Sequence, residues 1–155
     1  MTTKATYNTK VHIKNILIPI DGSEYSFNAA RCAIKVAKNE NAKLYCIHVI
    51  SNMPYGYESS PYAIDRYYRD LEQKVQSWFH KVREMAESEG ISELKTETFT
   101  GVKSVIGSII DYATVMDIDL IVIGTRGRTG LKRFFMGSVA NGVVQHAHCS
   151  VYLVR

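Results

Sequence analysis

The sequence predicts an α/β fold, with a single open five-stranded parallel sheet and helices on both of its faces. Short apolar runs rich in β-branched residues alternate with segments in which apolar residues recur every three or four positions. These runs contain few polar residues, which is typical of strands buried on both faces in a parallel sheet. The chain has 155 residues, the size of one ordinary domain. We therefore expect a flexible N-terminal segment over residues 1–14 and a single domain over residues 15–155.

The first predicted strand covers residues 15–20 and ends near Pro19, because a proline cannot donate to a strand ladder. The sequence Asp21-Gly22-Ser23 then breaks the apolar run and offers a helix cap. A helix is predicted over residues 23–39, where the apolar residues Phe27, Ala30, Ile34 and Ala37 recur at helical spacing.

The second predicted strand covers residues 43–50 and reads KLYCIHVI. A connection rich in turn residues follows at residues 51–61. The next helix, over residues 63–88, has the strongest periodicity in the chain and ends before Gly90, a common helix terminator. Its predicted apolar stripe consists of Ile64, Tyr67, Tyr68, Leu71, Val75, Trp78, Val82 and Met85.

The third predicted strand, residues 93–100, alternates polar with apolar or threonine residues, so it is expected at an edge of the sheet with one face exposed. The remaining elements are a helix over residues 104–116, a strand over 120–123, a helix over 138–147 and a strand over 150–155. Ligands of such folds bind at the carboxyl ends of the strands, where the strand order reverses. Asp21 and Gly124 each follow a strand end and would line one crevice if their strands are neighbours.

Composition and charge limit the classes of function. The net charge is +4, and basic residues gather in one local cluster, made of Arg126, Arg128, Lys132 and Arg133. Nucleic-acid binding would favour a continuous basic face, so no nucleic-acid partner is expected. The three cysteines form no CxxC pair and are predicted to be buried free thiols in a reducing compartment. No signal peptide or long apolar run is visible, so we expect a cytoplasmic protein without a membrane span.

The segment over residues 124–138, GTRGRTGLKRFFMGS, joins the fourth strand to the fourth helix. Backbone N–H groups at glycines and at a helix N-terminus, with cations nearby, suit a phosphate group. The segment is not a Walker A loop, because position 129 is a threonine where that motif requires a glycine. It is not a dinucleotide fingerprint either, because no G-x-G precedes the helix. Its spacing is G-x2-G-x9-G-S, formed by Gly124, Gly127, Gly137 and Ser138.

This spacing resembles the loop of the universal stress protein family, in the subgroup that binds ATP. Further similarity lies in IPIDGS at residues 18–23, HVI at residues 48–50 and CSVYLV at residues 149–154. The resemblance covers nearly the whole chain and implies a Rossmann-like sheet of the adenine nucleotide alpha hydrolase type. It also implies a bound adenine nucleotide, ATP with Mg²⁺ or Mn²⁺, and a homodimer formed through the last strand, residues 150–155.

The resemblance further implies roles for nine residues in holding the nucleotide. Pro19 would shape the adenosine pocket and Ile123 would line it, while Asp21 would contact the ribose end and Val49 would recognise adenine through its backbone. The phosphates would be held by Gly124, Gly127, Gly137, Ser138 and Val139. No catalytic residue and no metal-ligating side chain is expected.

Several of these features have a structural alternative. Asp21 is also suited to capping a helix, and the basic residues suit a solvated loop with one or two members near the phosphates. His146, His148 and Cys149 resemble a metal cluster, but residues two apart on a helix do not share a face, so a structural role is favoured. His48 lies at a strand end and has no serine or cysteine partner for nucleophilic catalysis.

The tyrosines at 55, 57, 62, 67 and 68 fit either an aromatic lid or a surface on which nucleobases stack. Core packing by Tyr67 or Tyr68, with the other tyrosines in a loosely ordered surface loop, is the favoured interpretation.

Three functions remain open from the sequence. We favour an ATP-binding regulatory protein of the stress response, with no more than weak ATP hydrolysis. A slow ATPase or phosphotransferase is the second hypothesis, although phosphoryl transfer needs metal ligands and a group that positions the nucleophile. A ligand-free homodimeric interaction module is the third, and the complete glycine motif argues against it.

Overall fold

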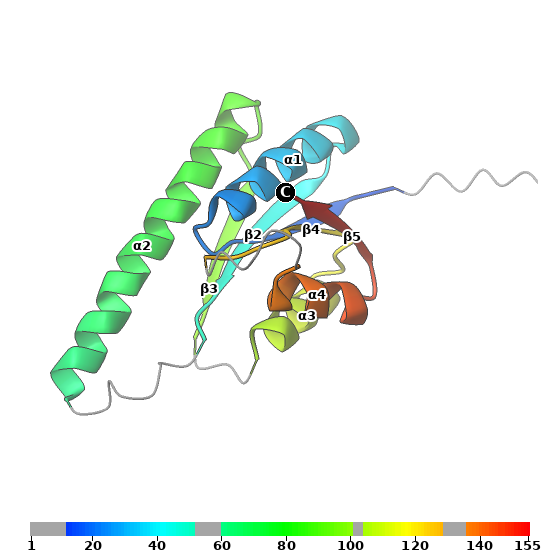
Figure 1. Ribbon diagram of the computed structural model, residues 1–155. Helices are drawn as coiled ribbons and strands as arrows, with labels where there is room; N and C mark the ends of the chain where they lie inside the picture. Colours follow the sequence, from blue (N-terminus) through cyan, green and yellow to red (C-terminus); the bar gives the residue numbers. More distant parts are fainter. Residues whose placement is uncertain (1–11, 52–59, 101–103, 129–135) are drawn as a thin grey trace, which may run out of the picture.

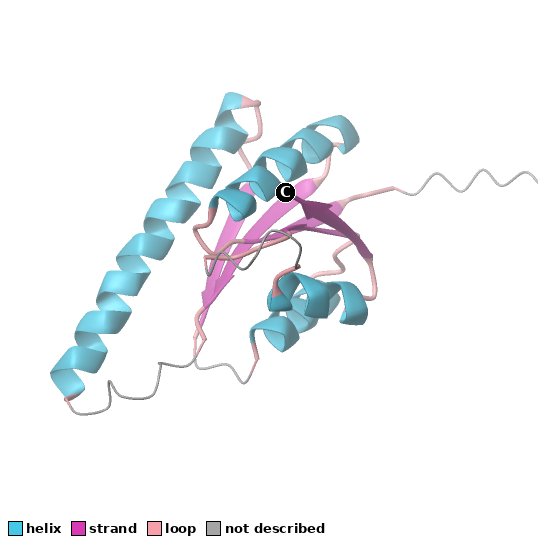
Figure 2. Ribbon diagram, viewed as in Figure 1, coloured by secondary structure: helices cyan, strands magenta, loops and turns pink. Residues whose placement is uncertain are grey.

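The structure is a computed structural model, which describes residues 12–51, 60–100, 104–128 and 136–155. The elements follow one another in the order β1 (Asn15–Pro19), α1 (Glu24–Glu40), β2 (Lys43–Val49), α2 (Pro61–Ser88), β3 (Leu94–Phe99), α3 (Val105–Val115), β4 (Leu120–Gly124), α4 (Ser138–His146) and β5 (Ser150–Val154). Figures 1 and 2 show these elements arranged as one sheet with helices on either side.

Within the described residues, the sheet has the order β3-β2-β1-β4-β5, and every neighbouring pair is parallel. The predicted fold class is therefore confirmed. β3 lies at an edge of the sheet, as its alternating pattern predicted, and β5 forms the other edge.

The predicted element boundaries are correct to within one or two residues. The largest difference is at α2, which begins at Pro61 rather than at residue 63. A proline is well tolerated in the first turn of a helix, where its missing N–H group would have no partner. Ile20 and Ile50 fall just outside β1 and β2, yet the N–H of Ile20 still donates to Ile47 and that of Ile50 to Phe99, both at 2.8 Å.

Both faces of the sheet are covered, which explains the unbroken apolar runs. Ile16 and Ile18 of β1 pack in one core cluster with residues of α1 and α2. Leu17, between them, packs in a second cluster with residues of α3 and α4. All three side chains are fully buried, and each such burial stabilises the fold by about 1.5–3 kcal/mol. α1 and α2 therefore cover one face of the sheet, and α3 and α4 the other (Figure 1).

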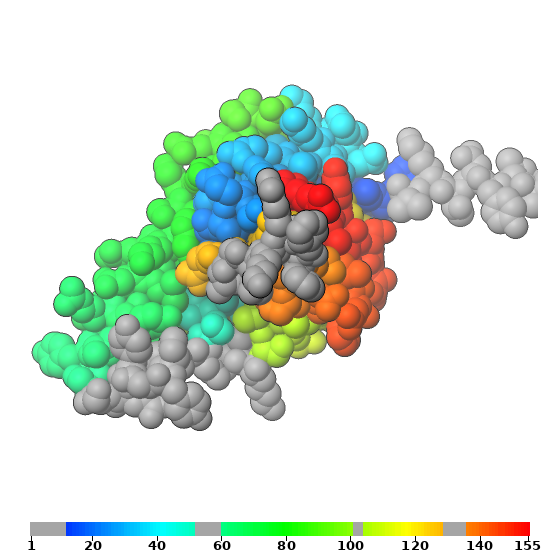
Figure 3. Space-filling view, in the orientation of Figure 1, coloured from blue at the N-terminus to red at the C-terminus, as the bar shows by residue number. Residues whose placement is uncertain are grey.

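α2 packs on the core from Leu71 onward. Its buried residues are Val75, Phe79, Val82 and Ala86, so Phe79 and Ala86 join the buried face and were missing from the predicted stripe. The first turns of α2 extend beyond the sheet (Figure 1) and protrude from the body of the molecule (Figure 3). Tyr67 and Tyr68 lie on these turns, half-exposed and edge to face with ring centroids 5.6 Å apart, so neither belongs to the core. Tyr55 and Tyr57 lie outside the described residues.

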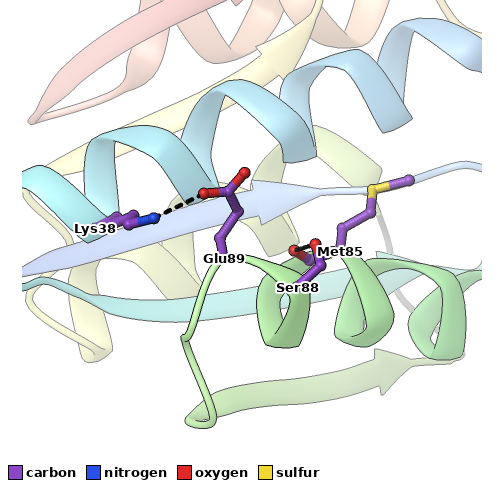
Figure 4. Close-up of polar contacts among 4 residues, drawn as sticks. All are labelled: Lys38, Met85, Ser88 and Glu89. Carbon is purple, nitrogen blue, oxygen red and sulfur yellow. Dashed lines mark hydrogen bonds and ion pairs between the residues drawn. The ribbon is translucent and has the colours of Figure 1, made fainter.

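An ion pair joins the end of α2 to α1. Lys38 Nζ lies 2.9 Å from Glu89 Oε2, and the Ser88 hydroxyl donates to the Met85 carbonyl at 2.7 Å (Figure 4). Lys38 holds the pKa of Glu89 below its usual value through this hydrogen bond. Because both charged side chains are exposed, the pair contributes little to stability.

The three cysteines are free thiols, but only Cys46 is fully buried. Burial raises the pKa of the Cys46 thiol, which is therefore neutral. Cys32 and Cys149 are half-buried, so the prediction of three buried thiols is wrong for these two. Among the described residues, no helix combines the length and the apolar character that a membrane span requires.

At its amino end, the described chain is anchored to the start of β4. The backbone N–H groups of Lys14 and Asn15 both donate to Asp119 Oδ2, at 2.8 and 2.9 Å. Residues 1–11, which make up most of the segment predicted to be flexible, lie outside the described residues.

Candidate functional site

The strand order reverses between β1 and β4. β1 pairs with β2 on one side and with β4 on the other, where Ile16 is opposite Leu120 and Leu17 is opposite Ile121. A cavity of about 310 Å³ opens at the carboxyl ends of these strands. This is where a doubly wound fold binds its ligands, and the volume suits a small molecule. The crevice predicted between Asp21 and Gly124 is therefore present, because both residues line this cavity.

The structure brings together every residue predicted to hold a nucleotide. The cavity lining includes Pro19, Asp21, Val49, Ile123, Gly124, Gly127, Gly137, Ser138 and Val139. It also includes residues that sequence reasoning did not assign to the site, among them Ile47, Ser51, Val105, Ile109 and Ala140. Val105 and Ile109 belong to α3, and their helical spacing gave no sign that they would face a cavity rather than the sheet.

The cavity has an apolar side and a polar side. Ile47, Val49, Ile109, Ile123 and Ala140 belong to the core cluster between the sheet and the helices α3 and α4. The polar side is formed by Asp21, His48, Arg126, Arg128 and Ser138. A ligand with a flat apolar part and an anionic polar part fits this division.

Asp21 joins the turn after β1 to the loop after β4. Its Oδ1 accepts the backbone N–H of Ser23 at 2.9 Å, and its Oδ2 accepts the backbone N–H of Arg128 at 3.2 Å. The cap of α1 is Ser23, whose hydroxyl accepts the N–H of Ser26 at 3.2 Å. Capping of α1 is therefore not the main role of Asp21, and its carboxylate instead holds the two loops that border the cavity.

Two glycines of the motif lie against protein atoms. A Cβ atom at Gly124 would lie 2.7 Å from the carbonyl carbon of Tyr25, and one at Gly127 would lie 2.7 Å from Asp21 Oδ2. A side chain at either position would push the loop away from α1 or from Asp21. The third glycine, Gly137, donates its N–H to the Thr125 carbonyl at 2.8 Å and directly precedes Ser138, the first residue of α4.

Comparison with known proteins places this architecture in a family. Residues 12–155 match the model of the universal stress protein family. The chain belongs to this family.

Individual universal stress proteins are similar to this chain in sequence and in structure. A universal stress protein of Methanocaldococcus jannaschii is 38% identical over 142 residues, which cover 92% of this chain and 82% of the relative. The solved structure of the universal stress protein UspA from Lactobacillus plantarum superimposes with a TM-score of 0.78 at 29% identity, covering 93% of this chain and 99% of that one. A more distant universal stress protein, solved in complex with cAMP, shares the fold with a TM-score of 0.67 at 19% identity, covering 93% and 98% of the two chains.

In this universal stress protein, His48 forms part of the cavity wall and is buried. Its Nδ1 lies 2.6 Å from the Ile20 carbonyl and therefore carries the proton that it donates, and its ring packs edge to face on Trp78 at 5.2 Å. Burial lowers the pKa of His48, against the effect of the hydrogen bond to Ile20, so the ring is neutral near pH 7. Its Nε2 is then an acceptor.

Only two members of the basic cluster lie within the described residues. Arg126 and Arg128 line the cavity, whereas Lys132 and Arg133 lie outside the described residues. The histidines near the C-terminus make separate contacts, with Nδ1 of His146 2.8 Å from the Gly142 carbonyl and Nδ1 of His148 3.4 Å from the Thr114 hydroxyl. In the described part of the chain, no group of three His, Cys, Asp or Glu side chains is placed to hold a metal ion.

Proposed function

We propose that this universal stress protein binds an adenine nucleotide, preferentially ATP, in the cavity at the carboxyl ends of β1 and β4. It would act as a regulatory protein of the stress response, in which the bound nucleotide changes its shape or its association. The observation that carries this proposal is the cavity, in which an apolar pocket meets a glycine-rich loop and the start of α4. A relative of the same fold that was solved in complex with cAMP supports it.

The two sides of the cavity suggest how the nucleotide would lie. Adenine would occupy the apolar side, against Val49, Ile109 and Ile123. Asp21 would meet the ribose hydroxyls, because a carboxylate accepts hydrogen bonds from hydroxyls and repels phosphates. Ser138 and Val139 would face the phosphates, since the N–H groups and the dipole at the start of a helix favour an anion, and Gly137 would let the chain approach them closely.

A divalent cation would enter with the nucleotide. Among the described residues that line the cavity, Asp21 supplies the carboxylate, and both of its oxygens already accept backbone N–H groups. Mg²⁺ prefers six oxygen ligands and usually keeps several waters alongside substrate phosphates. These residues fit a metal carried mainly by the triphosphate, where Mg²⁺ or Mn²⁺ would neutralise part of the phosphate charge.

Isothermal titration calorimetry with ATP and magnesium tests this proposal. We expect saturable heat with the wild-type protein and little heat with Gly127→Val, because a side chain at position 127 would collide with the Asp21 carboxylate. Gly107→Ala is a matched control on α3, where the added Cβ would meet Ser104 only at an ordinary contact distance of 3.5 Å. No heat from the wild type at millimolar ATP would contradict the proposal.

The alternative of a slow ATPase is tested in the same preparation. Under the proposed function, ATP persists for hours when incubated with the protein. Conversion to ADP that Gly137→Val abolishes would instead favour hydrolysis or phosphoryl transfer.

We also propose that the protein is a homodimer that forms through β5. This strand lies at an edge of the sheet, and edges of this kind tend to be covered or paired. A reducing compartment such as the cytoplasm suits its three free cysteines.

A further inference from the structure

Arg128 has an unusual combination of contacts at the rim of the cavity. Its backbone N–H is tied to Asp21 Oδ2 at 3.2 Å, so the position of its main chain is fixed. Its guanidinium lies over the ring of Trp78, 5.7 Å from the ring centroid. Within the described part of the chain, the guanidinium has neither a hydrogen-bond acceptor nor a carboxylate partner, and the residue is exposed. Its planar set of N–H donors is therefore available to an anion in the cavity.

Arg126, two residues earlier, is held differently. Its Nη1 donates to the Tyr25 hydroxyl at 3.0 Å, and its guanidinium also lies 5.5 Å from the centre of the Tyr25 ring. Arg126 and Arg128 thus rest on aromatic rings from different helices, Tyr25 of α1 and Trp78 of α2. The donors of Arg126 are already engaged with the protein, and the stacked guanidinium of Arg128 has the greater freedom to bind a ligand.

Trp78 is itself fixed in place by its surroundings. Its ring packs edge to face on His48 at 5.2 Å, and it lies so close to the turn after β1 that a Cβ at Gly22 would be 2.3 Å from Trp78 Cε2. Because His48 lines the cavity and contacts Trp78, the indole holds Arg128 beside the cavity wall. The positive charge of Arg128 also contributes, after burial, to the lowered pKa of His48, which agrees with a guanidinium close to the polar side.

The charge at this rim matches a phosphate group. The Asp21 carboxylate repels phosphates near its own oxygens. Arg128, whose backbone N–H binds this carboxylate, carries a guanidinium that compensates for the negative charge. A guanidinium recognises phosphate through charge-assisted and frequently bidentate hydrogen bonds. Stacking on an indole limits the rotamer freedom of the arginine before a ligand arrives, which reduces the entropy lost on binding.

We propose that Arg128 is a specificity-determining residue of the site, which selects phosphorylated nucleotides over the nucleoside, and that Trp78 is the positioning residue that holds it. The proposal rests on the proposed function and deepens it by naming the residue that reads the phosphates. It differs from the glycine motif, which supplies backbone N–H groups, because it assigns the discrimination to one side chain and its aromatic platform.

Calorimetric titration with ATP and with adenosine tests the role of Arg128. Arg128→Met is expected to weaken ATP binding by about 10-fold, the effect of losing one hydrogen bond to a charged group, and to leave adenosine binding unchanged. Arg128→Lys keeps the charge and should recover part of the loss. Lys43→Met is the matched control, because it removes one exposed positive charge at the opposite end of β2.

The possible outcomes separate this inference from the proposed function. If the wild type binds neither ATP nor adenosine, both the proposed function and this inference are wrong. If the wild type binds both ligands and Arg128→Met weakens neither, or weakens both equally, only the assignment of Arg128 is overturned. Because Arg128 is exposed, its substitution should not prevent folding.

Trp78 is the one tryptophan of the chain, so its fluorescence reports on this contact. ATP should change the emission of the wild type when its phosphates bind the guanidinium stacked on the Trp78 ring, and adenosine should not. By calorimetry, Trp78→Phe should retain ATP affinity because a ring remains beneath the guanidinium, whereas Trp78→Leu should weaken ATP but not adenosine. Equal ATP affinity in Trp78→Leu and the wild type, or an identical ATP-induced emission change in Arg128→Met, would overturn the positioning role.

Discussion

Gly22 shows how a single residue sets the relation between the cavity and α2. Its φ angle is +81°, a left-handed conformation that residues with a side chain rarely adopt. The position of its missing Cβ is filled by the indole of Trp78, at 2.3 Å. The turn that places Asp21 at the cavity therefore needs a glycine for two reasons, its backbone angle and the proximity of α2.

The two reasons can be separated by comparing Gly22 with Gly90. Gly90 has nearly the same φ angle, +83°, but no atom lies within 4 Å of the Cβ it would carry. Gly90→Ala should lower the free energy of unfolding by about 1 kcal/mol, the cost of the left-handed conformation. Gly22→Ala should cost about 2–4 kcal/mol, because overpacking against Trp78 adds to the same strain.

Urea denaturation of both variants measures this difference. Equal losses in the two proteins would show that Trp78 moves aside without cost, in which case the indole would be a less rigid platform than the structure indicates.

At the scale of the elements, the starts of the helices differ in how well they are capped. Ser104 precedes α3, and its hydroxyl accepts the N–H of Gly107 at 3.2 Å. Ser60 precedes α2 in the equivalent position, but its side chain makes no capping hydrogen bond. The cap of α3 also bears on the site, because the first turn and a half of α3 presents Val105 and Ile109 to the cavity.

Removing these hydroxyls should therefore have unequal effects. We expect Ser104→Ala to lower the free energy of unfolding by about 1 kcal/mol, the usual cost of losing a capping hydrogen bond. Ser60→Ala should change it by less than about 0.5 kcal/mol, as for an ordinary surface substitution. Thermal or urea unfolding checks both values, and a loss in Ser60→Ala as large as that in Ser104→Ala would contradict the assignment.

The elements also show what the sequence could predict. The strands were recognisable because burial on both faces requires continuous apolar residues, as in β1. The packing of α2 was not, because its first turns continue the apolar spacing with Ile64 and Tyr67 although they extend beyond the sheet. The anchoring of Lys14 and Asn15 by Asp119 joins residues more than 100 positions apart and leaves no local pattern.

At the scale of the whole molecule, part of the site could likewise be predicted from the sequence and part could not. The nine residues implied by the family resemblance all line one cavity, and most of them follow strand ends, which a parallel sheet brings to one edge. The contribution of α3 and the stacking of Arg128 on Trp78 depend on how helices from both faces pack around that edge. Such contacts follow from tertiary structure and could not be derived from spacing along the chain.

The two edges of the sheet differ in how well they are protected against pairing. β3 carries an ion pair between Lys95 and Glu97, and charged side chains discourage a second strand from adding to an edge. β5 reads SVYLV and leaves Tyr152 47% exposed. Of the two edges, β5 is therefore the better surface for a second copy of the chain.

A substitution at Tyr152 tests whether β5 forms the proposed dimer. We expect the wild-type protein at micromolar concentration to scatter light with the mass of two chains. Tyr152→Glu should weaken the dimer by at least about 10-fold, because a symmetric interface places the new charge on both sides of the contact. Tyr62→Glu is the control, since Tyr62 is 85% exposed on α2, away from β5. A monomeric wild type would rule out the dimer, and a Tyr152→Glu protein that remains dimeric would move the interface away from this strand.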